Sequence, residues 1–337
     1  MPKIRKPPFA PDGYRPASAP WVEVRTVERV GRGSLLALLV GISLIVGGSA
    51  TSTAGPVVAS ASETASRVLD LAPERTAAAA GSVDTRTFES ASLGRTMPYR
   101  IYLPPGYSEE STRYYPVVYL LHGMGGSDQQ WQQVGIVAAA DRLISSGAIA
   151  PVIIVMPEGE RAYWVDHATD GERWGRYTAV DVVADVESHF RTLVGKQSRA
   201  IGGLSMGAHG AVQLALNYPG EFGAVGAHSL VLRRYGSAPS YFGTTAEFAK
   251  RDPMQIVATK GKSGCSFALW IDIGDKDPWA PLASDFNSEL SSLGVPHQWH
   301  LWSGDHSGEY WSAHLDDYLR FYGAALTSHP ARAGALL

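Results

Sequence analysis

The stretch "RAIGGLSMGAHGAVQLAL" occupies residues 199–216, and it surrounds one serine, Ser205, with four glycines: Gly202, Gly203, Gly207 and Gly210. The residues before Ser205 are mostly small or apolar, as in a buried strand, and those after it have a helical composition. Glycine is needed where a Cβ atom would collide with a neighbouring backbone, and a serine on such a turn projects outward. The stretch therefore predicts a nucleophile elbow, and an ordinary glycine-rich turn is the alternative.

The rest of the chain predicts a sheet around this turn. Strand-like runs recur between helical stretches, and we expect strands within 87–93, 97–104, 115–123, 151–159, 198–205, 223–231, 267–274 and 297–304. The first two runs can form a hairpin, and the later ones resemble central parallel strands that helices cover on both faces. Apolar spacing predicts helices at 181–194 and 284–294. The predicted fold is α/β, with a mostly parallel, doubly wound sheet and helices on both faces.

Ligands bind at the carboxyl ends of the strands in such a sheet, so the residues that follow the strands are informative. Three segments with polar groups stand there besides the elbow: "HGMGGS" (122–127), "DIGDKDPW" (272–279) and "SGDHSGEYW" (303–311). With Ser205 they supply a serine, an aspartate and a histidine in that chain order, which is the order of the α/β-hydrolase fold.

These segments allow roles to be assigned. A serine hydroxyl is a weak nucleophile at neutral pH, so Ser205 needs a general base, and His306 is the candidate. Asp277 would orient the imidazole and stabilise its cation. The backbone N–H groups of Met124 and Met206 would form the oxyanion hole. Asp277 is preferred to Asp275 because the acid must reach sideways from the loop after the strand, although an error of one position in the strand boundary would favour an earlier aspartate.

Asp272 lies inside the apolar run "LWIDIG", so we expect it on the strand itself. Among the other histidines, His122 is expected to fix the loop that follows it. We expect His209 to be packed or at the rim of the site, and His297 and His300 to be structural.

The quoted segments resemble the esterase family that includes S-formylglutathione hydrolases, feruloyl esterases and mycolyltransferases. The resemblance covers roughly 86–322 and is most specific in "YPVVYLLHGMGG" (115–126), "GGLSMGAHGA" (202–211) and "GDHSGEYWSAHLDDYLRF" (304–321). It implies a serine esterase that works through an acyl-enzyme. Transfer of the acyl group to a sugar hydroxyl is the alternative within enzymes, and a non-catalytic envelope-binding protein is the alternative from another class.

Four tryptophans near the predicted strand ends are candidates for substrate binding: Trp131, Trp164, Trp279 and Trp311. Together they predict a cleft with an apolar wall for a small-molecule, lipid or aryl ester, and core packing is the alternative for each. The charged segment 158–174 is expected to cover the site, or to be a solvated surface loop.

Composition limits the other possibilities. The chain has 337 residues, a formal net charge of −3 and one cysteine, Cys265, so an intrachain disulfide is impossible. Nothing in the charge pattern indicates a nucleic-acid partner. No histidines and acids stand at zinc-ligand spacing, so the sequence predicts no metal site and no cofactor.

The N-terminal part predicts export. A basic polar leader (1–33) precedes an apolar run (34–50), which is either a cleaved signal peptide or a membrane anchor, with the following domain outside the cytoplasm. The long leader would be an anchor's cytoplasmic tail or the result of a start codon placed too far upstream. Residues 51–82 are too poor in large apolar groups to form a core and predict a linker. The esterase domain is expected at 83–328, with a short tail at 329–337.

Overall fold

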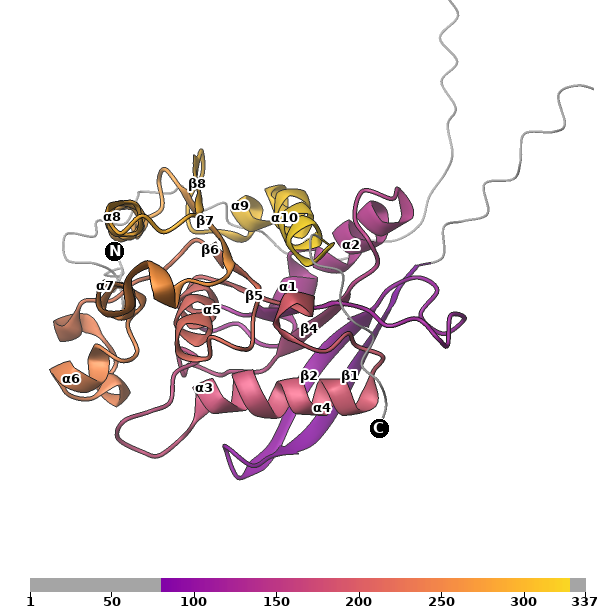
Figure 1. Cartoon of the computed structure of the whole chain (residues 1–337), viewed down its shortest axis with the longest axis horizontal. Helices are drawn as coiled ribbons and strands as arrows, with labels where there is room; N and C mark the ends of the chain where they lie inside the picture. Colours follow the sequence, from indigo (N-terminus) through magenta and orange to yellow (C-terminus); the bar gives the residue numbers. More distant parts are fainter. Residues whose placement is uncertain (1–79, 328–337) are drawn as a thin grey trace, which may run out of the picture. The chain divides into compact units, whose positions relative to one another are not determined.

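The computed structural model of the chain describes residues 80–327, and its centre is one sheet of eight strands in the order β1-β2-β4-β3-β5-β6-β7-β8. The strands are β1 (Ser82–Ser90), β2 (Arg95–Leu103), β3 (Val117–Leu121), β4 (Ile153–Pro157), β5 (Arg199–Leu204), β6 (Ala224–His228), β7 (Ala268–Gly274) and β8 (Gln298–Trp302). The β1–β2 hairpin is antiparallel and joins β4 in antiparallel register, whereas every pair from β4 to β8 is parallel. The mostly parallel α/β sheet predicted from the sequence is confirmed (Figure 1).

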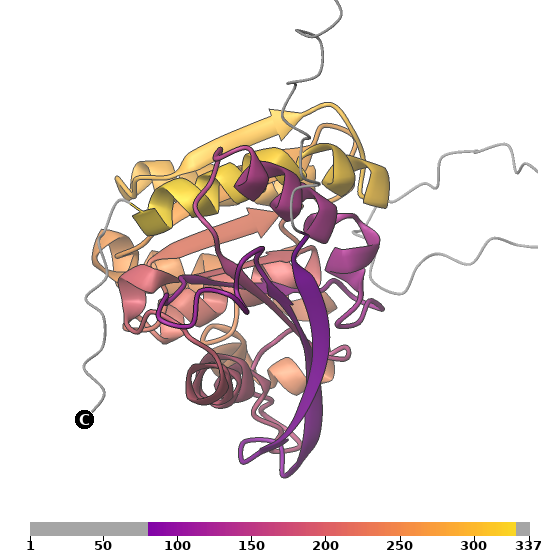
Figure 2. The ribbon, with the colours of Figure 1, turned by 90° about the vertical axis from the view of Figure 1, so that its right-hand side faces the viewer.

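Helices cover both faces of the sheet (Figures 1 and 2). They are α1 (Gln130–Gln133), α2 (Ile136–Ser145), α3 (Trp174–Arg176), α4 (Val183–His189), α5 (Met206–Asn217), α6 (Thr245–Phe248), α7 (Pro253–Gly264), α8 (Ala280–Ser292), α9 (Gly308–Ala313) and α10 (Leu315–Thr327). Alternate side chains of β3 enter two separate apolar clusters. Tyr119 lies in the cluster that contains residues of α4, α5, α7 and α8, and Val118 lies in the cluster that contains residues of α1, α2, α9 and α10. Burial on both faces explains why the central strands read as continuous apolar runs.

Two helix boundaries differ from their predictions. The helix predicted at 181–194 begins earlier, because α3 continues through a π-helical turn (Tyr177–Val182) into α4, and it ends at His189, where Phe190 adopts extended backbone angles. The helix predicted at 284–294 is α8, which starts with a proline in its first turn, and Gly294 follows its C-cap with a φ of 65°. A glycine there satisfies the left-handed geometry that ends many helices.

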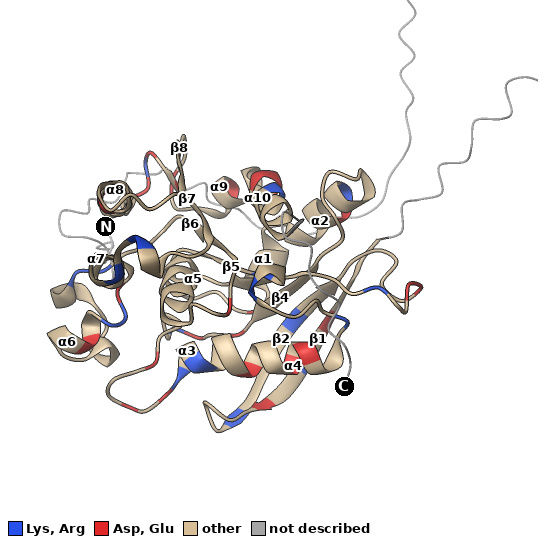
Figure 3. Cartoon of the chain, viewed as in Figure 1, with Lys and Arg blue, Asp and Glu red and all other residues tan. Residues whose placement is uncertain are grey.

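The predicted leader, apolar run and C-terminal tail lie outside the described residues, as does nearly all of the predicted linker. Within residues 80–327, no helix is long and apolar enough to span a bilayer. Charged residues of both signs are interspersed along the helices, loops and outer strands of this part (Figure 3).

Candidate active site

Ser205 lies between β5 and α5 with a φ of 57° and a ψ of −112°, a backbone conformation that side chains rarely adopt. Two of the neighbouring glycines make this turn possible. A Cβ atom at Gly203 would lie 2.2 Å from the Gly207 carbonyl carbon, and one at Gly207 would lie 2.2 Å from the carbonyl oxygen of Leu121. The strand and the helix therefore approach each other more closely than any side chain at these positions would permit.

The other two glycines of the opening stretch have different neighbours. A Cβ atom at Gly202 would lie 1.7 Å from the Tyr322 hydroxyl oxygen, and one at Gly210 would lie 2.6 Å from the Trp164 Cβ atom. Gly202 thus makes room for a side chain from α10, whereas Gly210 makes room for one from the loop after β4. The four glycines serve four different contacts around Ser205.

The structure brings Ser205, His306 and Asp277 together from three strand ends. The His306 Nε2 atom lies 2.8 Å from the Ser205 Oγ atom, and its Nδ1 atom lies 2.6 Å from an Asp277 carboxylate oxygen. The imidazole is 23% exposed, whereas the Asp277 side chain is fully buried. The second carboxylate oxygen of Asp277 accepts a hydrogen bond from the Trp279 backbone N–H at 2.9 Å. This arrangement can move a proton from the serine hydroxyl to the imidazole.

The two neighbouring aspartates have other partners. Asp275 accepts a hydrogen bond from the Gly304 N–H at 2.9 Å and so ties the turn after β7 to the loop that carries His306. Asp272 is buried on β7, as the sequence predicted.

The loop after β3 supplies one predicted oxyanion donor. Gly123 donates its N–H to the Gln130 side-chain oxygen at 2.7 Å, and the Gly126 N–H donates to the Gly123 carbonyl at 3.0 Å. Within the described residues, the backbone N–H groups of Met124 and Met206 have no acceptor among the backbone bonds of turns and caps. Both groups are therefore available to a ligand.

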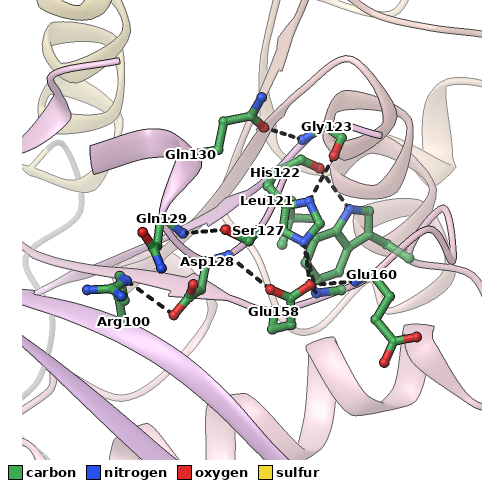
Figure 4. A network of polar contacts seen from close by, with 12 residues as sticks. Arg100, Leu121, His122, Gly123, Ser127, Asp128, Gln129, Gln130, Glu158 and Glu160 are labelled. Atoms are coloured by element: carbon green, nitrogen blue, oxygen red, sulfur yellow. Dashed lines mark hydrogen bonds and ion pairs between the residues drawn. The ribbon is translucent and has the colours of Figure 1, made fainter. Parts of the chain in front are cut away.

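A polar network under this loop fixes its position (Figure 4). The His122 Nε2 atom lies 2.9 Å from the Gly159 backbone nitrogen and 3.2 Å from a Glu158 carboxylate oxygen, and its Nδ1 atom lies 2.9 Å from the Gly123 carbonyl oxygen. His122 is buried, and it fixes the loop as expected from the sequence. The Glu158 carboxylate accepts from the backbone N–H groups of Asp128 and Glu160 at 3.2 and 2.8 Å.

The charge of Glu158 is stabilised by these contacts. Burial raises the pKa of Glu158, but His122 and the backbone donors outweigh it and lower the pKa to about 2. Asp128, the next acid in the network, forms an ion pair with Arg100 at 3.2 Å. The loop that carries Met124 is thus held by groups from β2, from the segment that follows β4 and from α1.

The four tryptophans divide into two pairs. Trp131 and Trp164 are 1% and 0% exposed, and their indole N–H groups donate to the carbonyls of Leu121 and His122. The structure therefore corrects their predicted role: both pack in the core and support the backbone leading into the loop, with no surface to offer a substrate. Trp279 and Trp311 are 9% and 8% exposed. Trp311 meets His306 edge to face at 5.4 Å between ring centroids.

The segment 158–174 brings together one group of potential metal ligands that the sequence analysis missed: His167, Asp170 and Glu172. The His167 Nδ1 atom lies 2.8 Å from an Asp170 oxygen and 4.0 Å from a Glu172 oxygen. Glu172 already pairs with Arg95 at 2.6 Å and accepts the Trp174 indole N–H at 2.8 Å. Its carboxylate is thus engaged in holding the segment against β2.

Three other histidines are occupied by the fold. His209 is fully buried, with its ring nitrogens 3.2 and 3.0 Å from the carbonyl oxygens of Val231 and Arg251. The His297 Nδ1 atom lies 2.8 Å from the Val295 carbonyl oxygen, its Nε2 atom lies 2.8 Å from the Asn287 side-chain oxygen on α8, and the His300 ring stacks on Trp270.

A serine on a strained turn, an aspartate and a histidine, each following a strand of a parallel sheet in that chain order, define the α/β-hydrolase class. The comparisons with known proteins narrow this class. Residues 90–322 match the model of the family described as "Putative esterase". The chain belongs to this family, as the resemblance of its motifs predicted.

Two relatives are named Esterase MT1326 and Esterase Rv1288, from Mycobacterium tuberculosis strains CDC 1551 / Oshkosh and ATCC 25618 / H37Rv. Each is 33% identical over 65% of this chain, and the match spans only 54% of the relative's length. An S-formylglutathione hydrolase of Arabidopsis thaliana is 25% identical over 70% of this chain and 91% of its own.

Solved structures agree with the fold. A ferulic acid esterase superposes with a TM-score of 0.67 at 27% identity, covering 73% of this chain and 99% of that one. An S-formylglutathione hydrolase from Agrobacterium tumefaciens superposes with a TM-score of 0.62 at 21% identity, over 73% of this chain and 96% of that one. The α/β-hydrolase fold is therefore confirmed.

Proposed function

We propose that the chain is a serine esterase that hydrolyses small carboxylic esters through an acyl-enzyme on Ser205. The observation that carries this proposal is the continuous hydrogen-bonded line from Ser205 Oγ through both ring nitrogens of His306 to Asp277. A non-catalytic binding protein does not need these two hydrogen bonds. Membership of the esterase family supports the same activity.

In the first half of the reaction, His306 takes the proton of Ser205 as the Oγ atom bonds to the ester carbonyl carbon. Asp277 holds the imidazole in the tautomer whose Nε2 atom faces Ser205, and it stabilises the imidazolium. The N–H groups of Met124 and Met206 donate to the oxyanion of the tetrahedral intermediate. The proton then passes from His306 to the departing alcohol, which leaves an acyl group on Ser205.

In the second half, water attacks the acyl carbon while His306 removes its proton. His306 then returns this proton to the Ser205 Oγ atom as the bond to the acyl carbon breaks and the acid leaves. A sugar hydroxyl in place of water would give acyl transfer at the same residues. The relatives' names favour hydrolysis, because they are esterases.

The test is turnover of p-nitrophenyl esters of short and long acyl chains, together with covalent labelling by a fluorophosphonate. We expect hydrolysis and a single label on Ser205, and Ser205→Ala, with an unchanged circular dichroism spectrum, to abolish both. A label on another serine would contradict the assignment. Repeating the assay with trehalose distinguishes the alternatives, since a transferase gives an acylated sugar in place of the free acid.

We also propose that residues 34–50 direct the esterase out of the cytoplasm, as a cleaved signal or as an anchor. The basic residues before this apolar run support that orientation. Residues 1–85 fused to a reporter that is active only outside the cytoplasm should give activity, and deletion of 34–50 should remove it. Activity of the deleted form would overturn the proposal. The mass of the mature protein separates cleavage from anchoring.

A further inference from the structure

A second cluster of polar side chains lies buried beside the active site, around Asp272 on β7. Its carboxylate is 0% exposed and accepts hydrogen bonds from four side chains. These donors are His228 Nδ1 (2.6 Å), Trp270 Nε1 (2.8 Å), Tyr310 OH (3.0 Å) and Tyr318 OH (2.9 Å). A buried carboxylate is costly unless it is fully hydrogen-bonded, so this degree of satisfaction is what the site requires.

Tyr322 connects this cluster to β5, the strand that precedes Ser205. The second ring nitrogen of His228 lies 2.8 Å from the Tyr322 hydroxyl. That hydroxyl occupies the space where Gly202 and Gly226 lack side chains, since Cβ atoms there would lie 1.7 and 2.0 Å from it. Burial and the negative charge of Asp272 raise the pKa of Tyr310, Tyr318 and Tyr322 well above the ordinary range, so these phenols stay protonated.

One backbone bond connects the cluster to the turn at Ser205, and another connects it to the turn that follows β6. The His228 carbonyl accepts a hydrogen bond from the Ser205 N–H at 2.9 Å, and the Asp272 carbonyl accepts one from the Ser229 N–H at 2.8 Å. The Ser229 hydroxyl in turn accepts the indole N–H of Trp311 at 2.9 Å. Trp311 is the residue that meets His306 edge to face.

A second connection runs through α9. This helix begins two residues after His306 and carries Tyr310, whose hydroxyl donates to Asp272. The Asp272 carboxylate therefore holds α9, the helix that follows His306, through the Tyr310 hydroxyl. Ser229 holds Trp311 beside the imidazole of His306.

We propose that Asp272 and His228 form a positioning centre for His306, acting through Tyr310 and through the Ser229–Trp311 hydrogen bond. Neither Asp272 nor His228 contacts the reacting atoms. Their contribution is to restrict the imidazole to the orientation that faces Ser205. The effect on catalysis rests on the proposed esterase function.

Tyr310→Phe and Tyr318→Phe form a matched pair for the test. Each removes one hydroxyl from the same Asp272 oxygen, and both phenols are buried, but only Tyr310 belongs to the helix next to His306. We expect similar losses in melting temperature. We expect Tyr310→Phe to lower kcat and the rate of fluorophosphonate labelling by about tenfold to a hundredfold with KM unchanged, because misplacement of a catalytic group has effects of this size. Tyr318→Phe should keep the wild-type kcat.

A second pair of variants tests the connection through the Ser229–Trp311 hydrogen bond. Trp311→Phe keeps a ring against His306 but loses the hydrogen bond to Ser229, and Ser229→Ala loses the same bond from the other side. If that bond positions His306, both variants lower kcat and the double variant is no worse than the single ones. Additive losses would overturn this connection.

Equal kcat values for Tyr310→Phe and Tyr318→Phe would overturn the proposal, whether or not these values are lower than the wild-type kcat. If the wild-type protein neither hydrolyses esters nor takes the label, the proposed function fails. The inference is then decided by the ¹⁵N signals of the His306 ring, assigned with His306→Gln. Tyr310→Phe should change the tautomer populations or broaden these signals, and Tyr318→Phe should not. Unchanged signals in both variants would again overturn it.

Discussion

Asp277 reaches His306 across the ends of β7 and β8 at 2.6 Å, whereas Asp275, two residues earlier, faces the backbone of Gly304. Two aspartates on one turn thus hold the same loop in different ways. One contacts the imidazole and the other contacts the chain that carries it.

This difference predicts opposite results for two similar substitutions. Asp277→Asn should lower kcat by up to about 10⁴, because an amide does not hold the imidazole in the required tautomer. Asp275→Asn should retain most activity, since its side-chain oxygen still accepts the Gly304 N–H. Steady-state kinetics with melting curves for both variants make the comparison. The reverse order of the two defects would assign the acid to Asp275.

The close approach of α5 to β3 predicts an unusual effect of alanine in a helix. Alanine normally stabilises a helix relative to glycine by about 1 kcal/mol. Gly207→Ala should instead reduce the free energy of unfolding by roughly 1–3 kcal/mol or more, because its Cβ atom would lie 2.2 Å from the Leu121 carbonyl oxygen. Gly220→Ala is the control, since a Cβ atom there meets nothing within 4 Å. Urea unfolding of both variants tests this, and equal midpoints would contradict it.

The position of the Met124 N–H depends on Gln130, whose side chain accepts the Gly123 N–H. We expect Gln130→Ala to lower kcat about tenfold, less than the 10²–10³ typical of losing an oxyanion donor outright, because the donor is loosened and not removed. Gln129→Ala is the matched control, since that neighbouring side chain is exposed. Kinetics on one p-nitrophenyl ester suffice, and a defect of equal size in both variants would argue against the role of Gln130.

Two buried groups, His209 and Asp252, predict opposing effects of pH on the free energy of unfolding. Burial lowers the pKa of His209 from 6.5 to about 4, so between these values the unfolded chain binds a proton that the folded chain excludes. Stability from His209 therefore falls as the pH drops. Burial raises the pKa of Asp252 from 3.8 to about 7, so the folded chain holds a proton that the unfolded chain releases. Stability from Asp252 falls as the pH rises.

The two contributions should largely cancel in the wild-type protein between pH 4 and 6.5, at roughly 3–4 kcal/mol each. His209→Gln should become less stable, relative to wild type, as the pH rises through this window. Asp252→Asn, which keeps the N-cap of α7, should become less stable as the pH falls. Urea midpoints measured from pH 4.5 to 7 test both signs, and parallel curves for all three proteins would refute the cancellation.

Much of this fold could be predicted from the sequence because parallel strands buried on both faces are continuous apolar runs, as β3 and β4 are. The turn at Ser205 was predictable for a similar reason, since only glycine fits next to a neighbouring backbone. The first turns of the helix predicted at 181–194, which begins at Trp174, were missed because a π-helical turn interrupts the spacing on which the prediction depends.

The proximity of Ser205, Asp277 and His306 could be predicted because chain order carries this information. The burial of side chains could not be predicted. Trp131 and Trp164 stand near strand ends in the sequence, yet tertiary packing turns them inward. The partners of Asp272 lie up to 46 residues away, so no local pattern shows that a carboxylate in an apolar strand is fully hydrogen-bonded.

The contact between Tyr322 and the glycines of β5 and β6 has a consequence for the order of folding. The hydroxyl that fills this space comes from the last described helix, and so does a donor to Asp272. Until α10 is synthesised and docks, the centre of the sheet contains an unfilled space, and the Asp272 carboxylate lacks one of its four donors. A nascent chain on the ribosome can therefore pair its first strands early, but it gains its full cooperative stability only after nearly the whole domain has emerged.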